Sequence, residues 1–108
     1  MKKYLVLILM FISMNSFAGA GYITTGATVT KVSATSQNAD AFWVWYSSGT
    51  DKCSGKVKFQ LANAGTEGVF QRTFTLATTA LVSGKRVDVY SYTDDTDCLS
   101  AVSIDLIG

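Results

Sequence analysis

Residues 66–92 read TEGVFQRTFTLATTALVSGKRVDVYSY, and this stretch decides the fold. Its first part has the apolar spacing of one helix face, at Phe70, Phe74, Ala77 and Leu81, widened by Val69, Leu76 and Ala80. Thr66 suits the N-cap, and Gly84 suits the residue after the last turn. Four threonines disfavour a helix, so a strand remains the alternative. We predict a helix over residues 69–83.

The second part of the stretch alternates instead of following a helical period. In residues 86–92, Val87 and Val89 fall on one face, while Asp88, Tyr90 and Tyr92 fall on the other. A period of two is typical of a strand with one buried side. The turn TDDTD and a closing strand follow, with Val102, Ile104 and Leu106 on one face.

Three strands are predicted before the helix, over residues 22–35, 41–47 and 56–61. In the first, Ile23, Thr25, Ala27 and Val29 share one side, and Gly26 indicates a bulge or a bend. In the third, Val57, Phe59 and Leu61 point inward, and Lys56, Lys58 and Gln60 outward; residues 62–68 read as a loop. The fold class is therefore β-rich α+β: a five-stranded OB-like barrel with one helix between strands three and four. Closure would also avoid bare strand edges.

The first 18 residues have the pattern of a secretory signal peptide. Lys2 and Lys3 precede an apolar run from Tyr4 to Ile12, and small residues then favour cleavage after Ala18, or after Ala20. An uncleaved anchor is the alternative, but the run is about half of the ~20 residues that a membrane-spanning helix needs. We expect a single domain over residues 19–108, secreted or periplasmic, with no membrane insertion once the leader is removed.

Cys53 and Cys98 are the two cysteines of the chain. An even cysteine count in an exported protein predicts a disulfide, here joining the start of the third strand to the start of the fifth. A redox or nucleophilic thiol is the alternative, but the chain has neither a C-x-x-C motif nor a histidine to activate one.

Composition argues against several function classes. The chain has 108 residues, no histidine, and 9 Lys+Arg against 8 Asp+Glu. Removing Lys2 and Lys3 leaves 7 against 8, a net charge of −1, and this balance disfavours a nucleic-acid partner. Asp94, Asp95 and Asp97 read as a polar turn and not as a calcium loop. We expect no metal, no cofactor and no enzymatic activity, because no acid–base constellation can be assembled.

The stretch from Phe70 to Ile107 resembles a group of small exported bacterial proteins, most of them uncharacterised. It is more distantly similar to the receptor-binding B subunits of pentameric toxins of the subtilase cytotoxin type. The matching residues are Ser83, Gly84, Lys85, Arg86, Val87 and Val89. The resemblance implies an OB-like fold and, by analogy, sugar binding and a homo-oligomer. No sugar-contacting residue of those subunits is carried over.

Two aromatic pairs are candidate binding residues. Trp43 and Trp45 share one face of the second strand, where they form a platform for a sugar or a protein unless that face fills the barrel. Tyr90 and Tyr92 offer a second patch, or else pair across strands on a solvated face. The expected function is a non-catalytic exported module that presents an aromatic face to a glycan or a protein. The alternative is a periplasmic or cell-surface structural or accessory protein with no soluble ligand.

Overall fold

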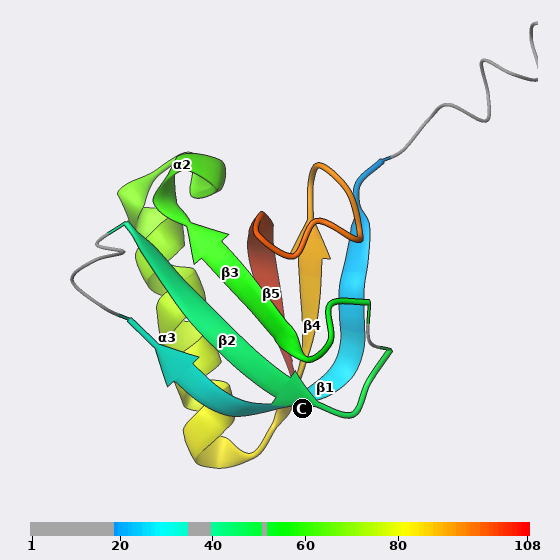
Figure 1. The fold of residues 1–108 in the computed structure, drawn as a ribbon. Helices are drawn as coiled ribbons and strands as arrows, with labels where there is room; N and C mark the ends of the chain where they lie inside the picture. Colours follow the sequence, from blue (N-terminus) through cyan, green and yellow to red (C-terminus); the bar gives the residue numbers. More distant parts are fainter. Residues whose placement is uncertain (1–18, 35–39, 51) are drawn as a thin grey trace, which may run out of the picture.

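The computed structural model describes residues 19–34, 40–50 and 52–108, and its five strands close into a ring (Figure 1). The strands are β1 (Gly21–Ser33), β2 (Ala41–Ser47), β3 (Lys56–Gln60), β4 (Arg86–Ser91) and β5 (Ala101–Ile107). Around the ring they follow the order β1, β2, β3, β5, β4. Neighbouring strands are antiparallel except β3 and β5, which are parallel and pair at Phe59 and Ala101. The predicted closed five-stranded sheet is confirmed; the predicted leader lies outside the described residues.

The predicted helix is confirmed as α3 (Glu67–Ser83), two residues longer at its start than expected. The Thr66 hydroxyl accepts a hydrogen bond from the Val69 N–H at 3.2 Å, which satisfies one free donor of the first turn. At the other end Gly84 has a left-handed φ of 73°, and its N–H donates to the Ala80 carbonyl at 2.9 Å. Both caps are those that the sequence predicted.

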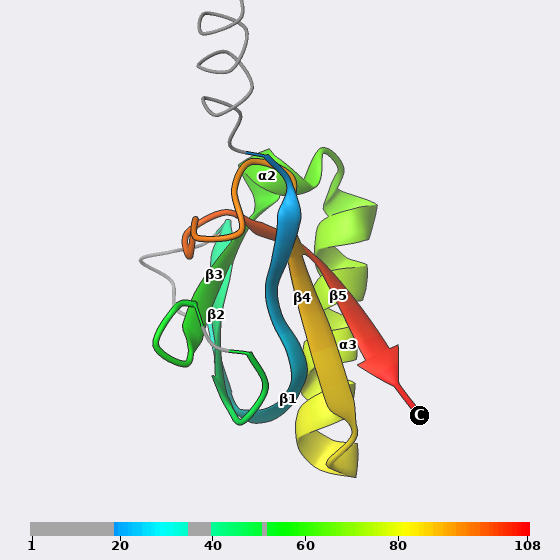
Figure 2. The ribbon, with the colours of Figure 1, turned by 90° about the vertical axis from the view of Figure 1, so that its right-hand side faces the viewer.

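The predicted inward face of the helix is only partly correct. Thr73, Ala77 and Ala80 are the buried residues of α3, whereas Phe74 and Leu81 are 37% and 39% exposed. The small side chains let the helix lie close to β1 and β5, which it packs against in Figure 2. Thr73 is tolerated there because its hydroxyl donates to the Phe70 carbonyl at 2.7 Å.

The end of the third strand was predicted wrongly. Leu61 does not continue β3 inward; it begins the short helix α2 (Leu61–Ala64), whose remaining residues fall in the segment 62–68 that was expected to be a loop. Its N–H donates instead to the Asp40 carbonyl at 2.8 Å. Gly65 ends the turn with a φ of 86°, a conformation that glycine adopts without a steric penalty.

The first strand bends, and this changes which of its side chains are buried. The register of β1 against β4 shifts on both sides of Thr24, so Ile23 and Thr24 are both buried. The predicted shared side of Ile23, Thr25 and Ala27 is wrong for Thr25, because the shift turns Thr25 outward, where its hydroxyl lies 3.1 Å from that of Thr50. Gly26 has a φ of 65°, and its N–H donates to Asp88 Oδ1 at 2.8 Å.

The core lies inside the ring, beneath α3. Phe42 of β2 and Phe59 of β3 are paired across the strands and stack with ring centroids 4.9 Å apart. Phe42 also contacts Phe70 and Phe74 of α3. Val44, Val57, Val87 and Val89 complete the fully buried centre. The alternation that predicted inward faces for β3 and β4 is thus confirmed at these positions. For β2 the sequence left open which face is buried, and the structure places Phe42 and Val44 inside.

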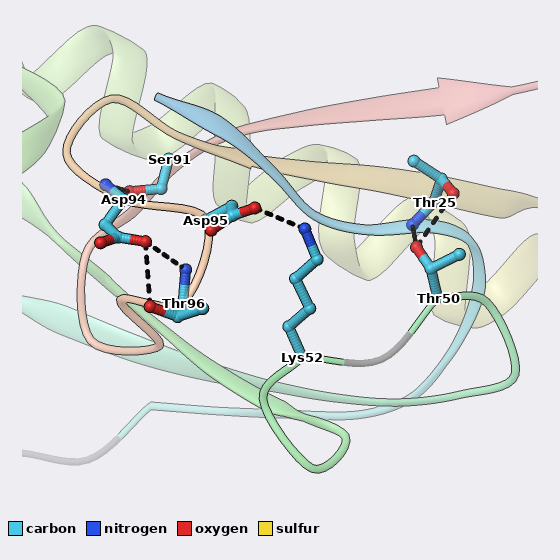
Figure 3. A network of polar contacts seen from close by, with 7 residues as sticks. All are labelled: Thr25, Thr50, Lys52, Ser91, Asp94, Asp95 and Thr96. Atoms are coloured by element: carbon cyan, nitrogen blue, oxygen red, sulfur yellow. Dashed lines mark hydrogen bonds and ion pairs between the residues drawn. The ribbon is translucent and has the colours of Figure 1, made fainter. Parts of the chain in front are cut away.

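The predicted disulfide is confirmed: Cys53 and Cys98 are bonded. It joins the loop after β2 to the loop after β4, and Figure 3 shows two further links from the first of these loops. Lys52 forms an ion pair with Asp95 of the second loop. Thr50 Oγ1 accepts from the Thr25 N–H of β1 at 3.1 Å. The loop before β3 is therefore held to two other parts of the chain.

This loop approaches β1 closely at Gly49, where we expect an alanine to be harmful. Gly49 has a φ of 78°, and an added Cβ would lie 2.6 Å from the Thr25 carbonyl oxygen. Gly26→Ala is the matched control, because Gly26 has a φ of 65° with nothing within 4 Å of the added atom. We expect a loss in the free energy of unfolding of about 2–3 kcal/mol for Gly49→Ala and about 1 kcal/mol for Gly26→Ala, measured in urea. Equal losses would contradict the close approach.

Candidate functional site

The two tryptophans lie on the outer face of β2. Strand alternation places Phe42, Val44 and Tyr46 in the core, so Trp43 and Trp45 point the other way and are half-buried. Their ring centroids are 6.3 Å apart and the ring planes are tilted by 42°. The structure therefore places this pair on the surface of the ring and not inside it.

The strand register surrounds these rings with lysines. Lys31 of β1 and Lys56 of β3 stand opposite Trp45 on either side. Ser33 and Lys58 flank Trp43 in the same way. Directly paired residues of antiparallel strands share a face, so these side chains form two rows across three strands. We call this the tryptophan–lysine surface; it consists of Lys31, Ser33, Trp43, Trp45, Lys56 and Lys58.

The lysine ammonium groups lie over the indole rings. Lys31 Nζ is 4.5 Å from the centroid of the Trp45 ring. Lys56 Nζ lies between the two rings, 4.2 Å from Trp43 and 5.1 Å from Trp45. Lys58 Nζ is 5.5 Å from Trp43. Each contact of this kind contributes about 0.5–1 kcal/mol at an exposed site, so the rings and the cations orient one another.

Among the described residues, no carboxylate forms an ion pair with the lysines of this surface. Within residues 19–34, 40–50 and 52–108, Lys52 and Asp95 form the one ion pair, and both lie in the loops described above. Lys31, Lys56 and Lys58 are instead held against aromatic rings. The surface consequently combines apolar ring area with three ammonium groups that can take an anion.

The predicted tyrosine pair lies elsewhere, with Tyr90 on β4 and Tyr92 just after that strand, which ends at Ser91 and not at residue 92. Tyr90 packs edge-on against Tyr22 of β1 and against Tyr92, with centroids 5.0 and 5.7 Å apart. Tyr92 is 67% exposed and Tyr22 is 45% exposed. Because β1 lies between β4 and β2, the structure does not join the tyrosines and tryptophans into one site.

The acidic turn after β4 uses the carboxylates of Asp94 and Asp97 internally. Asp94 Oδ1 accepts from the N–H and the hydroxyl of Thr96, both at 2.9 Å, and Ser91 lies beside them in Figure 3. The backbone hydrogen bond from Thr96 is the main reason why the pKa of Asp94 lies below its ordinary value. Asp97 accepts from the Thr93 hydroxyl at 3.1 Å. The described residues contain no group of three or more side chains suited to hold a metal.

Sequence reasoning found the tryptophans but missed the lysines around them. Lys56 and Lys58 were placed outward, at the same i, i+2 spacing as Trp43 and Trp45 on the preceding strand. An antiparallel pairing of the two strands would have brought these four side chains together. Lys31 and Tyr22 could not be placed, because the bulges of β1 change its register.

The fold and the site define a small disulfide-bonded protein: a five-stranded sheet closed in a ring, a helix packed against it, and an outer surface of tryptophan and lysine. The chain matches the model of DUF5992, a family of unknown function, over residues 2–108, and it belongs to that family. No curated protein and no solved structure gave a match. Within the part of the chain that is described, no helix is both long and apolar enough to cross a membrane.

Proposed function

We propose that this protein is an exported, non-catalytic binding module built on an OB-type barrel, and that it binds a glycan. The ring order β1, β2, β3, β5, β4 supports the OB assignment, as do the parallel β3–β5 contact and α3 between β3 and β4. The disulfide and the leader-like sequence of residues 1–18 support export.

The observation that carries the proposal is the position of the tryptophan–lysine surface. It lies on the outer side of β1, β2 and β3, and OB-folds bind oligosaccharides and oligonucleotides on the face of strands two and three. The C–H groups of a sugar ring carry partial positive charge and pack well on the electron-rich face of an indole. Two neighbouring indoles on one strand offer such faces to consecutive parts of a ligand once the lysine side chains over them move aside.

The proposal predicts a loss of glycan binding when an indole is removed. We expect Trp43→Ala and Trp45→Ala each to weaken binding about tenfold or more, because each removes a ring from the contact surface. The measurement is a glycan array followed by titration of the best ligand. Tyr92→Ala is the matched control, since it removes an exposed aromatic ring just after the end of β4, away from the tryptophans. Unfolding curves check that each variant is folded.

Other outcomes separate the remaining functions. Loss of binding in Tyr92→Ala alone would move the site to the cluster of Tyr22, Tyr90 and Tyr92. A folded protein with no glycan or protein partner, retained in the periplasm on fractionation, would contradict the proposal and favour a structural or accessory role. Native mass spectrometry would test the homo-oligomer that the toxin resemblance implies.

A further inference from the structure

The tryptophan–lysine surface repeats itself along β2. One row contains Lys31, Trp45 and Lys56, and the next contains Ser33, Trp43 and Lys58. Successive residues on one face of a strand are about 6.8 Å apart, and the two ring centroids are 6.3 Å apart. Each row thus presents an aromatic ring with at least one cation beside it. A surface of this kind matches a ligand whose own units repeat and carry negative charge.

Three of the seven basic residues of residues 19–108 lie on this surface, and acidic residues gather elsewhere on the molecule. β4 and β5 follow β1 around the ring on the side away from β2. Asp88 of β4 and Asp105 of β5 are directly paired there. The turn after β4 adds Asp94, Asp95 and Asp97. Residues 19–108 carry 7 basic against 8 acidic residues, once Lys2 and Lys3 are subtracted from the 9 of the whole chain. A long nucleic-acid strand needs a broad basic footprint, which this distribution does not supply.

We infer that the ligand of the tryptophan–lysine surface is an anionic linear polysaccharide, with carboxylate or sulfate groups at regular intervals. This inference rests on the proposed function. Sugar rings would pack on Trp43 and Trp45, and the anionic groups would pair with the ammonium groups of Lys31, Lys56 and Lys58. These ammonium groups already lie within 4.2–5.5 Å of the ring centroids. A sugar that takes the place of a lysine on an indole face therefore keeps its charged substituent close to the displaced ammonium group.

The test uses the full chain, expressed with its own leader, and pairs of polymers that differ in charge. Polygalacturonate is compared with its methyl ester, and dextran sulfate with dextran. We expect one or both charged polymers to bind about tenfold or more tightly than the matched neutral polymer, and we expect added salt to weaken that binding. The measured quantity is the Kd at two salt concentrations.

Variants of the lysines test the assignment on the protein side. We expect the triple change Lys31→Gln, Lys56→Gln and Lys58→Gln to weaken binding of the charged polymer about tenfold or more. The corresponding triple change to arginine should retain binding, because it keeps the three charges. Lys85→Gln, on the exposed link between α3 and β4, should have no effect. Tryptophan fluorescence and thermal unfolding show whether the triple variants are folded.

The outcomes distinguish the inference that the ligand is anionic from the proposed function, glycan binding, on which it rests. In one outcome, charged and neutral polymers bind equally well, the glutamine changes have no effect on binding, and Trp45→Ala abolishes it. That outcome would overturn the inference and leave the glycan-binding module in place. Binding of no polysaccharide at all would overturn both. Tighter binding to single-stranded oligo(dT), or to vesicles containing phosphatidylglycerol, would overturn the inference in favour of a different anionic partner.

Discussion

Replacing both Cys53 and Cys98 with alanine should lower the free energy of unfolding by about 4 kcal/mol. The two cysteines are 45 residues apart in the sequence, and their bond restricts that long segment in the unfolded chain. The same bond holds the loop before β3 to the loop before β5. Domains of this size are stable by about 5–15 kcal/mol, so the loss is a large share of the total. Urea unfolding at constant pH measures it.

The control for the cysteine change is the unaltered protein treated with a reductant. It should lose a similar free energy, because it loses the same cross-link while keeping both side chains. The ion pair of Lys52 with Asp95 joins the same two loops but is exposed, so Lys52→Gln should cost less than about 1 kcal/mol. A loss below about 1 kcal/mol for the double alanine variant would show that packing alone holds the two loops together.

Phe42→Ala should destabilise the protein by about 3–5 kcal/mol. The Phe42 side chain is 1% exposed and contacts aromatic rings from both β3 and α3. Its removal leaves a cavity between the sheet and the helix, which the ring of strands cannot collapse to fill. Thermal and urea unfolding should agree on the loss.

Phe74→Ala is the matched control for the core. Phe74 touches the edge of Phe42 but is 37% exposed, so its truncation removes less buried area and should cost about 1–2 kcal/mol. Equal losses for the two variants would mean that Phe74 is as important to the core as Phe42. That result would restore the inward position that helical spacing predicts for it.

Local patterns were sufficient to predict most elements of the fold. Thr66 and Gly84 marked the ends of α3 because caps act through hydrogen bonds within a few residues. The alternation in β2 separated Phe42 from Trp43 because neighbouring side chains of a strand point to opposite faces. The disulfide followed from having two cysteines in a chain with an export-like leader. None of these inferences needed a partner strand.

The errors occurred where a distant segment decided the outcome. Thr25 turns outward because β1 bends to pair with both β4 and β2, and its side chain meets Thr50 of a loop. Leu81 is partly exposed because small residues, and not the large ones of the helical stripe, allow α3 to approach the sheet. Helical spacing gives the direction of a side chain but not the distance to the surface that it meets.

The sequence by itself determined the five strands, the helix with its caps, the cysteine pair and the placement of Trp43 and Trp45 on one face of β2, because these follow from local patterns or from residue counts; the tertiary structure decided that this face is the outer one. Only the tertiary structure decided that Lys31, Lys56 and Lys58 stand beside those rings. The reason is the strand register: Lys31 comes opposite Trp45 only after a shift between Val29 and Lys31 in β1. A shift of one residue would turn the lysine to the other face of the sheet.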